Sequence, residues 1–99
     1  MARLLHADEI VRQLTGLPDW EWEGGALHRD VEAPDFPAAI RIVDEIADVA
    51  EQMDHHPDID IRWRRLVFRL STHSANGVTQ LDIELAHRID EITRDHGAH

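Results

Sequence analysis

Two adjacent histidines, His55 and His56, stand at the point where an acidic stretch meets a proline, and a third histidine, His73, follows after an alternating apolar segment. Glu51 lies one helical turn before His55, and Asp82 follows His73 by nine positions. An imidazole ring titrates near neutral pH, with an unperturbed pKa of about 6.5, so it can donate a proton, accept one or bind a metal. Neighbouring carboxylates would favour its charged form.

The elements around these residues must bring them together. An amphipathic helix is expected from Asp35, a plausible N-cap, to about residue 53, and Pro57 ends it. Two alternating strands follow, at 58–63 and 66–71, and they read as a hairpin. Residues before the first strand of a hairpin and after its second strand lie close together. The histidine pair, His73 and the nearby Asp54 are therefore expected at one end of the sheet.

Three interpretations of this cluster compete. Solvated loop histidines are the ordinary expectation, because loop residues are usually exposed. A metal site is the second, although adjacent histidines point in different directions and no His-Glu-x-x-His helix is present. General acid–base catalysis is the third. No obvious nucleophile accompanies the cluster, which argues against acyl transfer. The residues alone leave the metal site and acid–base catalysis both open.

The remaining chain predicts an α+β fold. A short helix is expected over 7–15, and a hairpin over 20–33 with its turn at Gly24-Gly25. Thr79 and Asp82 resemble a capping box that starts a last helix, and residues 94–99 read as a frayed tail. The predicted fold is a two-layer sandwich, with a four-stranded antiparallel sheet and three helices on one face, in the order α-β-β-α-β-β-α. For the middle helix the expected buried stripe is Phe36, Ile40, Val43, Ala47, Ala50 and Met53.

Composition narrows the classes of protein. The 99 residues suit a single domain over 1–99 with its core at about 7–94. A net charge of −10 disfavours binding to nucleic acid and to anionic membranes. The absence of cysteine excludes disulfides and thiolate chemistry. Neither a signal peptide nor a stretch of transmembrane length is recognised, so a cytoplasmic location is expected.

The spacing of these residues resembles the pterin-4a-carbinolamine dehydratase family. The family pattern places an acidic residue before a His-His-Pro triplet, then an aromatic residue, a histidine and an aspartate. The stretches EQMDHHPDIDIRW and RRLVFRLSTHSANGVTQLD reproduce that pattern, and a weaker likeness extends back to Trp20 and forward through LAHRIDEI. The matching residues are Glu51, His55, His56, Pro57, Trp63, His73 and Asp82.

The resemblance implies an enzyme that removes water from a 4a-hydroxytetrahydropterin and yields quinonoid dihydropterin, in tetrahydrobiopterin recycling. It implies His55 and His73 as acid–base candidates, His56 mainly as a pterin ligand, and Glu51 and Asp82 as groups that orient histidines. No cofactor and no metal are implied, because the pterin is the substrate. The pterin-contacting residues implied by the resemblance are Asp54, Ser71, Thr72 and Ser74, with Trp20 as a wall of the pocket or, as an alternative, a core residue.

The resemblance also implies partners. Members of the family form homodimers through sheet edges or homotetramers through helices, and an open edge on so small a sheet favours pairing. Some members serve as dimerisation cofactors or assembly factors, so a non-catalytic binding module on the same fold is the alternative function. The intact set of three histidines favours the enzyme.

Overall fold

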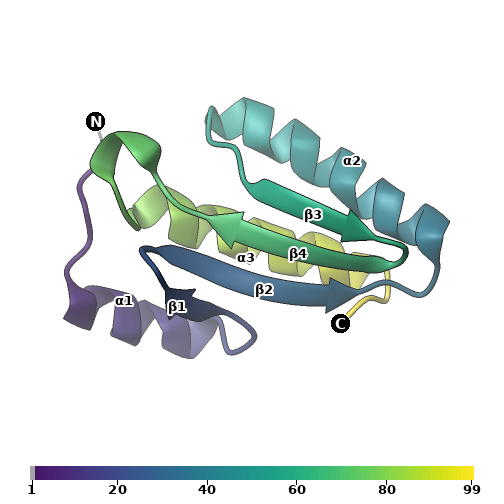
Figure 1. Ribbon diagram of the computed structural model, residues 1–99, viewed down its shortest axis with the longest axis horizontal. Helices are drawn as coiled ribbons and strands as arrows, with labels where there is room; N and C mark the ends of the chain where they lie inside the picture. The colour runs from purple at the N-terminus through teal and green to yellow at the C-terminus, as the bar shows by residue number, and fades with distance from the viewer. Residues whose placement is uncertain (1) are drawn as a thin grey trace.

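The computed structural model describes residues 2–99 and confirms the predicted fold class and order of elements (Figure 1). Two short 3-10 helices, η1 (Leu14–Gly16) and η2 (His73–Ala75), add to that order. Within residues 2–99 no helix is both long and apolar enough to cross a membrane. The main elements are α1 (Ala7–Gln13), β1 (Glu21–Glu23), β2 (Ala26–Glu32), α2 (Phe36–Met53), β3 (Asp58–Arg62), β4 (Arg65–Leu70) and α3 (Gln80–Asp95).

The sheet has the strand order β1-β2-β4-β3, and every neighbouring pair is antiparallel. In Figure 1, α3 passes behind β2 and β4, while α2 runs along the β3 edge. Alternate residues of β4 face the helices, and among them Phe68 is fully buried. Phe68 pairs with Arg29 of β2 on one side and with Ile59 of β3 on the other. The core therefore lies between the sheet and the helices, and it leaves the ends of the strands free to carry a site.

The expected buried stripe of α2 is confirmed only in part, since Ala50 is buried and Val43 and Met53 are half-buried against the core. Phe36 is 47% exposed and Ala47 is also exposed, whereas Ile42 and Ile46 are fully buried. The helix carries apolar residues on two adjacent stripes, and both satisfy a three- and four-residue spacing. Which stripe turns inward depends on where α2 crosses the sheet and α3, and periodicity does not contain that information.

The predicted frayed tail is also wrong. The helix α3 continues to Asp95, and the residues after it fold back onto β2. His99 and Glu32 exchange two backbone hydrogen bonds, of 3.0 and 3.2 Å, and Ala98 is 8% exposed. Edge hydrogen bonds of a strand are available to any extended segment that reaches them, so this pairing holds the C-terminal segment.

Trp63, expected at the end of a strand, instead lies in the turn between β3 and β4. Its φ is 55°, in the left-handed region that a bulky side chain rarely adopts, and the side chain is highly exposed. The Arg64 guanidinium lies 5.0 Å from the centre of its ring. The carbonyl of Arg64 accepts from the Ala33 amide at 2.9 Å, which ties this turn to the start of α2.

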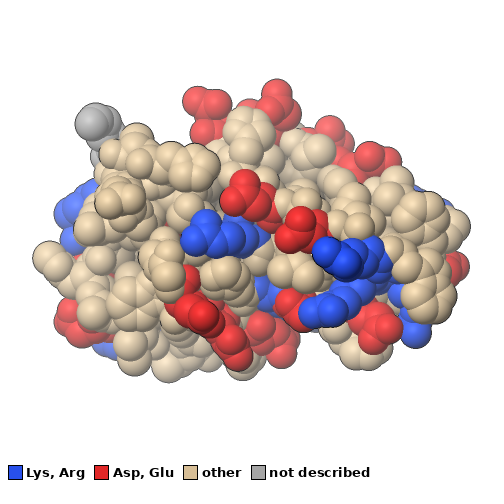
Figure 2. Space-filling model, in the orientation of Figure 1, with Lys and Arg blue, Asp and Glu red and all other residues tan. Residues whose placement is uncertain are grey.

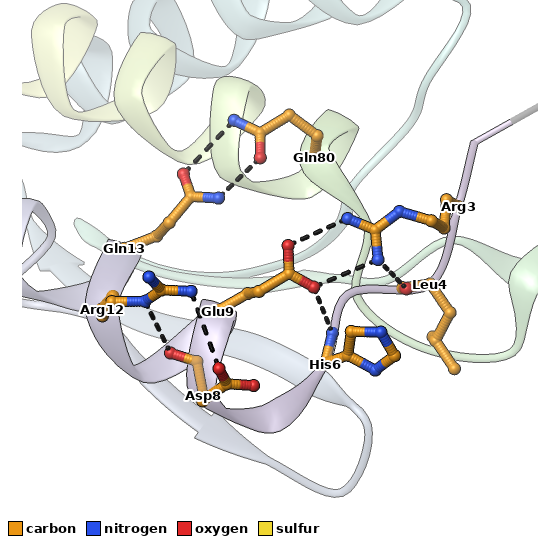
Figure 3. A network of polar contacts seen from close by, with 8 residues as sticks. All are labelled: Arg3, Leu4, His6, Asp8, Glu9, Arg12, Gln13 and Gln80. Atoms are coloured by element: carbon orange, nitrogen blue, oxygen red, sulfur yellow. Dashed lines mark hydrogen bonds and ion pairs between the residues drawn. The ribbon is translucent and has the colours of Figure 1, made fainter.

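Polar contacts order the N-terminal segment, and one pair of side chains joins it to α3 (Figure 3). Glu9 accepts from the His6 backbone amide at 2.9 Å and pairs with Arg3 through both carboxylate oxygens. The side-chain amides of Gln13 and Gln80 bond to each other, at 2.6 Å for the shorter contact. These contacts fix α1 beside the N-terminal end of α3, the same end that carries Asp82.

Candidate functional site

The end of α2 sets the position of the histidine pair. Asp54 adopts a left-handed conformation, with φ of 49° and ψ of 44°, directly after the last helical residue. The His55 amide then reaches back to the Ala50 carbonyl at 3.0 Å, which closes a Schellman-type helix end. This reversal directs the side chain of His55 inward, where the residue is 8% exposed, and leaves His56 exposed.

The segment after β4 brings the third histidine to the same place. Thr72 and Gly77 bond to each other through their backbones in both directions, at 2.8 and 3.3 Å, and enclose the short helix η2. His73 begins η2 and is exposed. Asn76 ends the turn with φ of 57°, a left-handed conformation that asparagine tolerates.

These two segments enclose a hollow of about 310 Å³ at one end of the sheet. All three histidines of the motif line it, as the hairpin argument predicted. A smaller hollow of about 210 Å³ shares Ser71, Thr72 and His73 with it and extends towards the β1–β2 turn and Arg69. The lining of the first hollow is Asp54, His55, His56, Pro57, Asp58, Ser71, Thr72, His73 and Ser74.

Behind this hollow lies a buried polar network centred on Asp82, whose side chain is fully buried. One carboxylate oxygen accepts from His55 Nε2 at 2.6 Å. The other accepts from the Thr72 hydroxyl at 2.8 Å and from the Thr79 amide at 2.9 Å. The latter bond belongs to the predicted capping box of α3. A buried carboxylate with three donors is well satisfied, so this network holds His55 in one orientation.

His56 lies in different surroundings. Its Nε2 bonds to Glu51, but the two side chains are 56% and 76% exposed. Acidic side chains gather along the α2 edge of the face in Figure 2, and acidic and basic ones are interspersed across the sheet. Asp54 and Asp58 add two carboxylates to the hollow itself. The hollow therefore combines three imidazoles with carboxylates, a set suited to exchanging protons and to binding N–H groups.

The structure brings nearly all predicted site residues together. Glu51 and Asp82 do not line the hollow, but each bonds to a histidine that does. Trp20 lies elsewhere, 4% exposed, with its indole N–H donating to Asp90 at 2.8 Å, so it takes the alternative place as a core residue. Asp58 was missed, although its position directly after the His-His-Pro triplet was a usable signal.

A larger hollow, of about 510 Å³, lies at the β1–β2 edge and contains no residue of the histidine motif. Asp19, Arg29 and His99 are among its lining residues. Among residues 2–99, no group of three or more histidine and acidic side chains has an arrangement that could hold a metal ion. The hollow with the three histidines is thus the smaller one, and its chemistry rather than its size makes it the candidate site.

The fold and this hollow define a small α+β protein with a candidate site lined by three histidines and two aspartates. Residues 3–92 match the family described as pterin 4 alpha carbinolamine dehydratase. A Nocardia farcinica protein named "Putative pterin-4-alpha-carbinolamine dehydratase" is 54% identical, over 92% of this chain and 96% of its own. A protein of the same name from Mycolicibacterium smegmatis is 46% identical, over 93% and 98%. The chain belongs to the pterin-4a-carbinolamine dehydratase family.

Solved structures agree with this assignment. A transcriptional coactivator/pterin dehydratase from Brucella melitensis superposes with a TM-score of 0.88 at 34% identity, over 91% of this chain and 98% of its own. A pterin dehydratase-like protein identified as a RuBisCO assembly factor in the alpha-carboxysome superposes with a TM-score of 0.65, over 75% of this chain and 88% of its own. At 17% identity the second likeness shows a shared fold alone.

Proposed function

We propose that this protein dehydrates 4a-hydroxytetrahydropterins by histidine general acid–base catalysis. The observation that supports the proposal is the meeting of His55, His56 and His73 in one hollow, in a chain of this family. The reaction breaks the bond between C4a and its hydroxyl oxygen and forms a C4a–N5 double bond. The hydroxyl leaves as water after it gains a proton, and N5 loses one, so protons balance without a redox step.

Two of the histidines suit these two proton transfers. His55 is held by Asp82, and His73 approaches the same hollow from η2. A donor and an acceptor on different segments can act on different atoms of one ring. The proposal gives His55 and His73 the acid and base roles and gives His56 the role of binding the pterin. The amino group and ring N–H groups of a pterin are donors, and Asp54 and Asp58 offer acceptors for them. The chemistry calls for neither a metal nor a further cofactor.

A coupled assay tests the proposal. A phenylalanine hydroxylase generates 4a-hydroxytetrahydropterin, and its decay is followed by absorbance with and without this protein. We expect acceleration that falls on the order of 100-fold or more in His55→Ala and His73→Ala, the usual size of a general acid–base contribution. His87→Ala is the matched control, because His87 is exposed on α3 and lies outside the hollow.

A binding role is the second candidate function, and the coactivator name of the Brucella relative favours testing it. Folded wild-type protein that fails to accelerate the decay would overturn the dehydratase proposal and favour a partner-binding module. Metal analysis of protein purified without an affinity tag would test the remaining metal-site interpretation. Stoichiometric metal lost in His55→Ala would contradict the metal-free proposal.

A further inference from the structure

Thr72 lines the hollow, but its hydroxyl bonds to buried groups behind it. The residue is 5% exposed, and its hydroxyl bonds to two groups behind the hollow, Asp82 at 2.8 Å and the Thr79 hydroxyl at 2.8 Å. Both of these partners are fully buried. The resemblance implies pterin contacts through backbone groups of this segment, and the Thr72 hydroxyl belongs instead to the network that supports His55.

Counting protons gives this network a direction. Each hydroxyl has one proton to donate. The Asp82 carboxylate only accepts, so the Thr72 proton points to Asp82. The contact between the two threonine hydroxyls must then use the Thr79 proton. Thr79 Oγ1 in turn accepts from the Leu81 amide at 3.3 Å. The chain therefore runs from the start of α3 through Thr79 and Thr72 to one oxygen of Asp82.

The other oxygen of Asp82 accepts from His55, which requires the proton on Nε2. Nδ1 of His55 has no hydrogen-bond partner among residues 2–99. Among these residues, the side-chain polar atoms that are both buried and without a partner are Arg29 Nε and Thr93 Oγ1. His55 Nδ1 is not one of them, so this atom is accessible. His55 Nδ1 is thus the ring nitrogen left to meet a molecule in the hollow.

We infer that Thr72 and Thr79 are positioning residues that hold Asp82 and, through it, fix His55 as the Nε2–H tautomer with Nδ1 as its proton-exchanging atom. This inference rests on the proposed dehydratase function for its catalytic consequence. Without the Thr72 hydroxyl, the carboxylate keeps two of its three donors, His55 Nε2 and the Thr79 amide, and is held less firmly. The imidazole then loses a fixed partner for Nε2, and a second tautomer with Nδ1 blocked by a proton becomes accessible.

A structural role alone makes a different prediction. The bond from the Thr79 amide to Asp82 is part of a capping box and serves α3 whether or not a histidine is nearby. If the Thr72 hydroxyl only added stability, its removal would lower the free energy of unfolding without changing the His55 ring. The tautomer of His55 therefore separates positioning from stability.

The test compares Thr72→Val, which keeps the shape of the side chain and removes the hydroxyl, with Thr72→Ser, which keeps the hydroxyl. Protein carrying ¹⁵N-labelled histidine is studied by long-range ¹H–¹⁵N NMR at about pH 8.5, well above the ordinary histidine pKa of about 6.5. His55→Gln assigns the signal. Thr93→Val is the matched control, because Thr93 is a fully buried threonine of α3 whose hydroxyl has no partner.

We expect the Nε2–H tautomer in the wild type, Thr72→Ser and Thr93→Val, and a mixture in Thr72→Val. In the dehydration assay, Thr72→Val should lower kcat on the order of ten-fold or more and change KM about two-fold at most, since a displaced base affects the chemical step. If Thr72→Val does not fold, Thr72→Ala also removes the hydroxyl, and the same change in the His55 tautomer and in kcat is expected of it.

An unchanged tautomer in folded Thr72→Val or Thr72→Ala would overturn the inference. A changed tautomer with unchanged kcat, in a protein whose wild type is active, would overturn the positioning role. If the wild type has no dehydratase activity, the proposed function fails, but the tautomer still decides whether the threonines orient His55. The two failures are therefore distinguishable.

Discussion

The starts of α1 and α3 use one local motif in opposite surroundings. In each, the side chain of an acidic residue in the first turn accepts from the backbone amide three residues earlier, Glu9 from His6 and Asp82 from Thr79. In each, the same carboxylate also meets a basic side chain, Arg3 for Glu9 and His55 for Asp82. The first network lies at the surface, and the second is sealed beneath the hollow.

That difference changes what the motif does. Solvent competes with the contacts of Glu9 and screens them, so its network contributes a cap and a tether for the N-terminal segment. Asp82 has no access to solvent, so its donors determine its orientation and that of His55. Burial thus converts a capping carboxylate into a group that orients a catalytic candidate.

Asp82→Asn should have the largest effect on stability. Asparagine replaces one carboxylate oxygen of Asp82, an acceptor, by an NH₂ group, which is a donor. A buried donor that now faces this NH₂ group, the Thr72 hydroxyl or His55 Nε2, is left without an acceptor. We expect a loss of about 2–4 kcal/mol in the free energy of unfolding, together with loss of activity. Urea unfolding measures the first. An unchanged urea midpoint would show that the network is not sealed as described.

Replacing the two adjacent histidines should lower the free energy of unfolding by different amounts, although both line the hollow. His55→Ala removes a buried hydrogen bond and leaves a cavity, for a loss of about 2 kcal/mol. His56→Ala breaks only an exposed contact with Glu51, for about 0–1 kcal/mol. Thermal or urea unfolding of the two variants side by side measures this. Equal losses would contradict the contrast between a buried and an exposed partner.

Asp54→Gly should separate binding from folding. The left-handed conformation of Asp54 suits glycine better than aspartate, so we expect stability unchanged or raised by up to about 1 kcal/mol. The carboxylate that lines the hollow is lost, so KM for the pterin should rise. Asp54→Asn is the control that keeps the shape and tolerates the same conformation. A lower Tm for Asp54→Gly, or an unchanged KM, would contradict one of these two roles.

Glu9→Gln should have the smallest effect, and its size depends on pH. The hydrogen bond from Arg3, with one from the His6 amide, lowers the pKa of Glu9 from 4.5 to about 2. A depressed folded-state pKa adds stability above pH 4.5, and this is lost as pH falls towards 2. The difference in Tm between wild type and variant should therefore be small at pH 7 and vanish near pH 2. A difference that grows on acidification would contradict the assignment.

Local patterns predicted much of this molecule. Three local features were confirmed: the end of α2 before Pro57, the turn at Gly24-Gly25 and the capping box at Asp82. Each depends on neighbours within a few positions. The frayed C-terminal tail and the burial of Phe36 and Ala47 on α2 were predicted wrongly. Both depend on contacts between segments far apart in the chain, and two apolar stripes on α2 gave periodicity no means to choose.

The sequence by itself determined which residues meet at the site. Helix end, hairpin and capping box are local features, and together they bring His55, His56 and His73 to one end of the sheet. The tertiary structure decided what each residue does there. It sealed Asp82 and Thr72, left His56 and Glu51 in water, and moved Trp20 into the core. Burial is a property of the packed molecule, because it depends on every segment that covers a side chain, and burial decides how strongly each polar group acts.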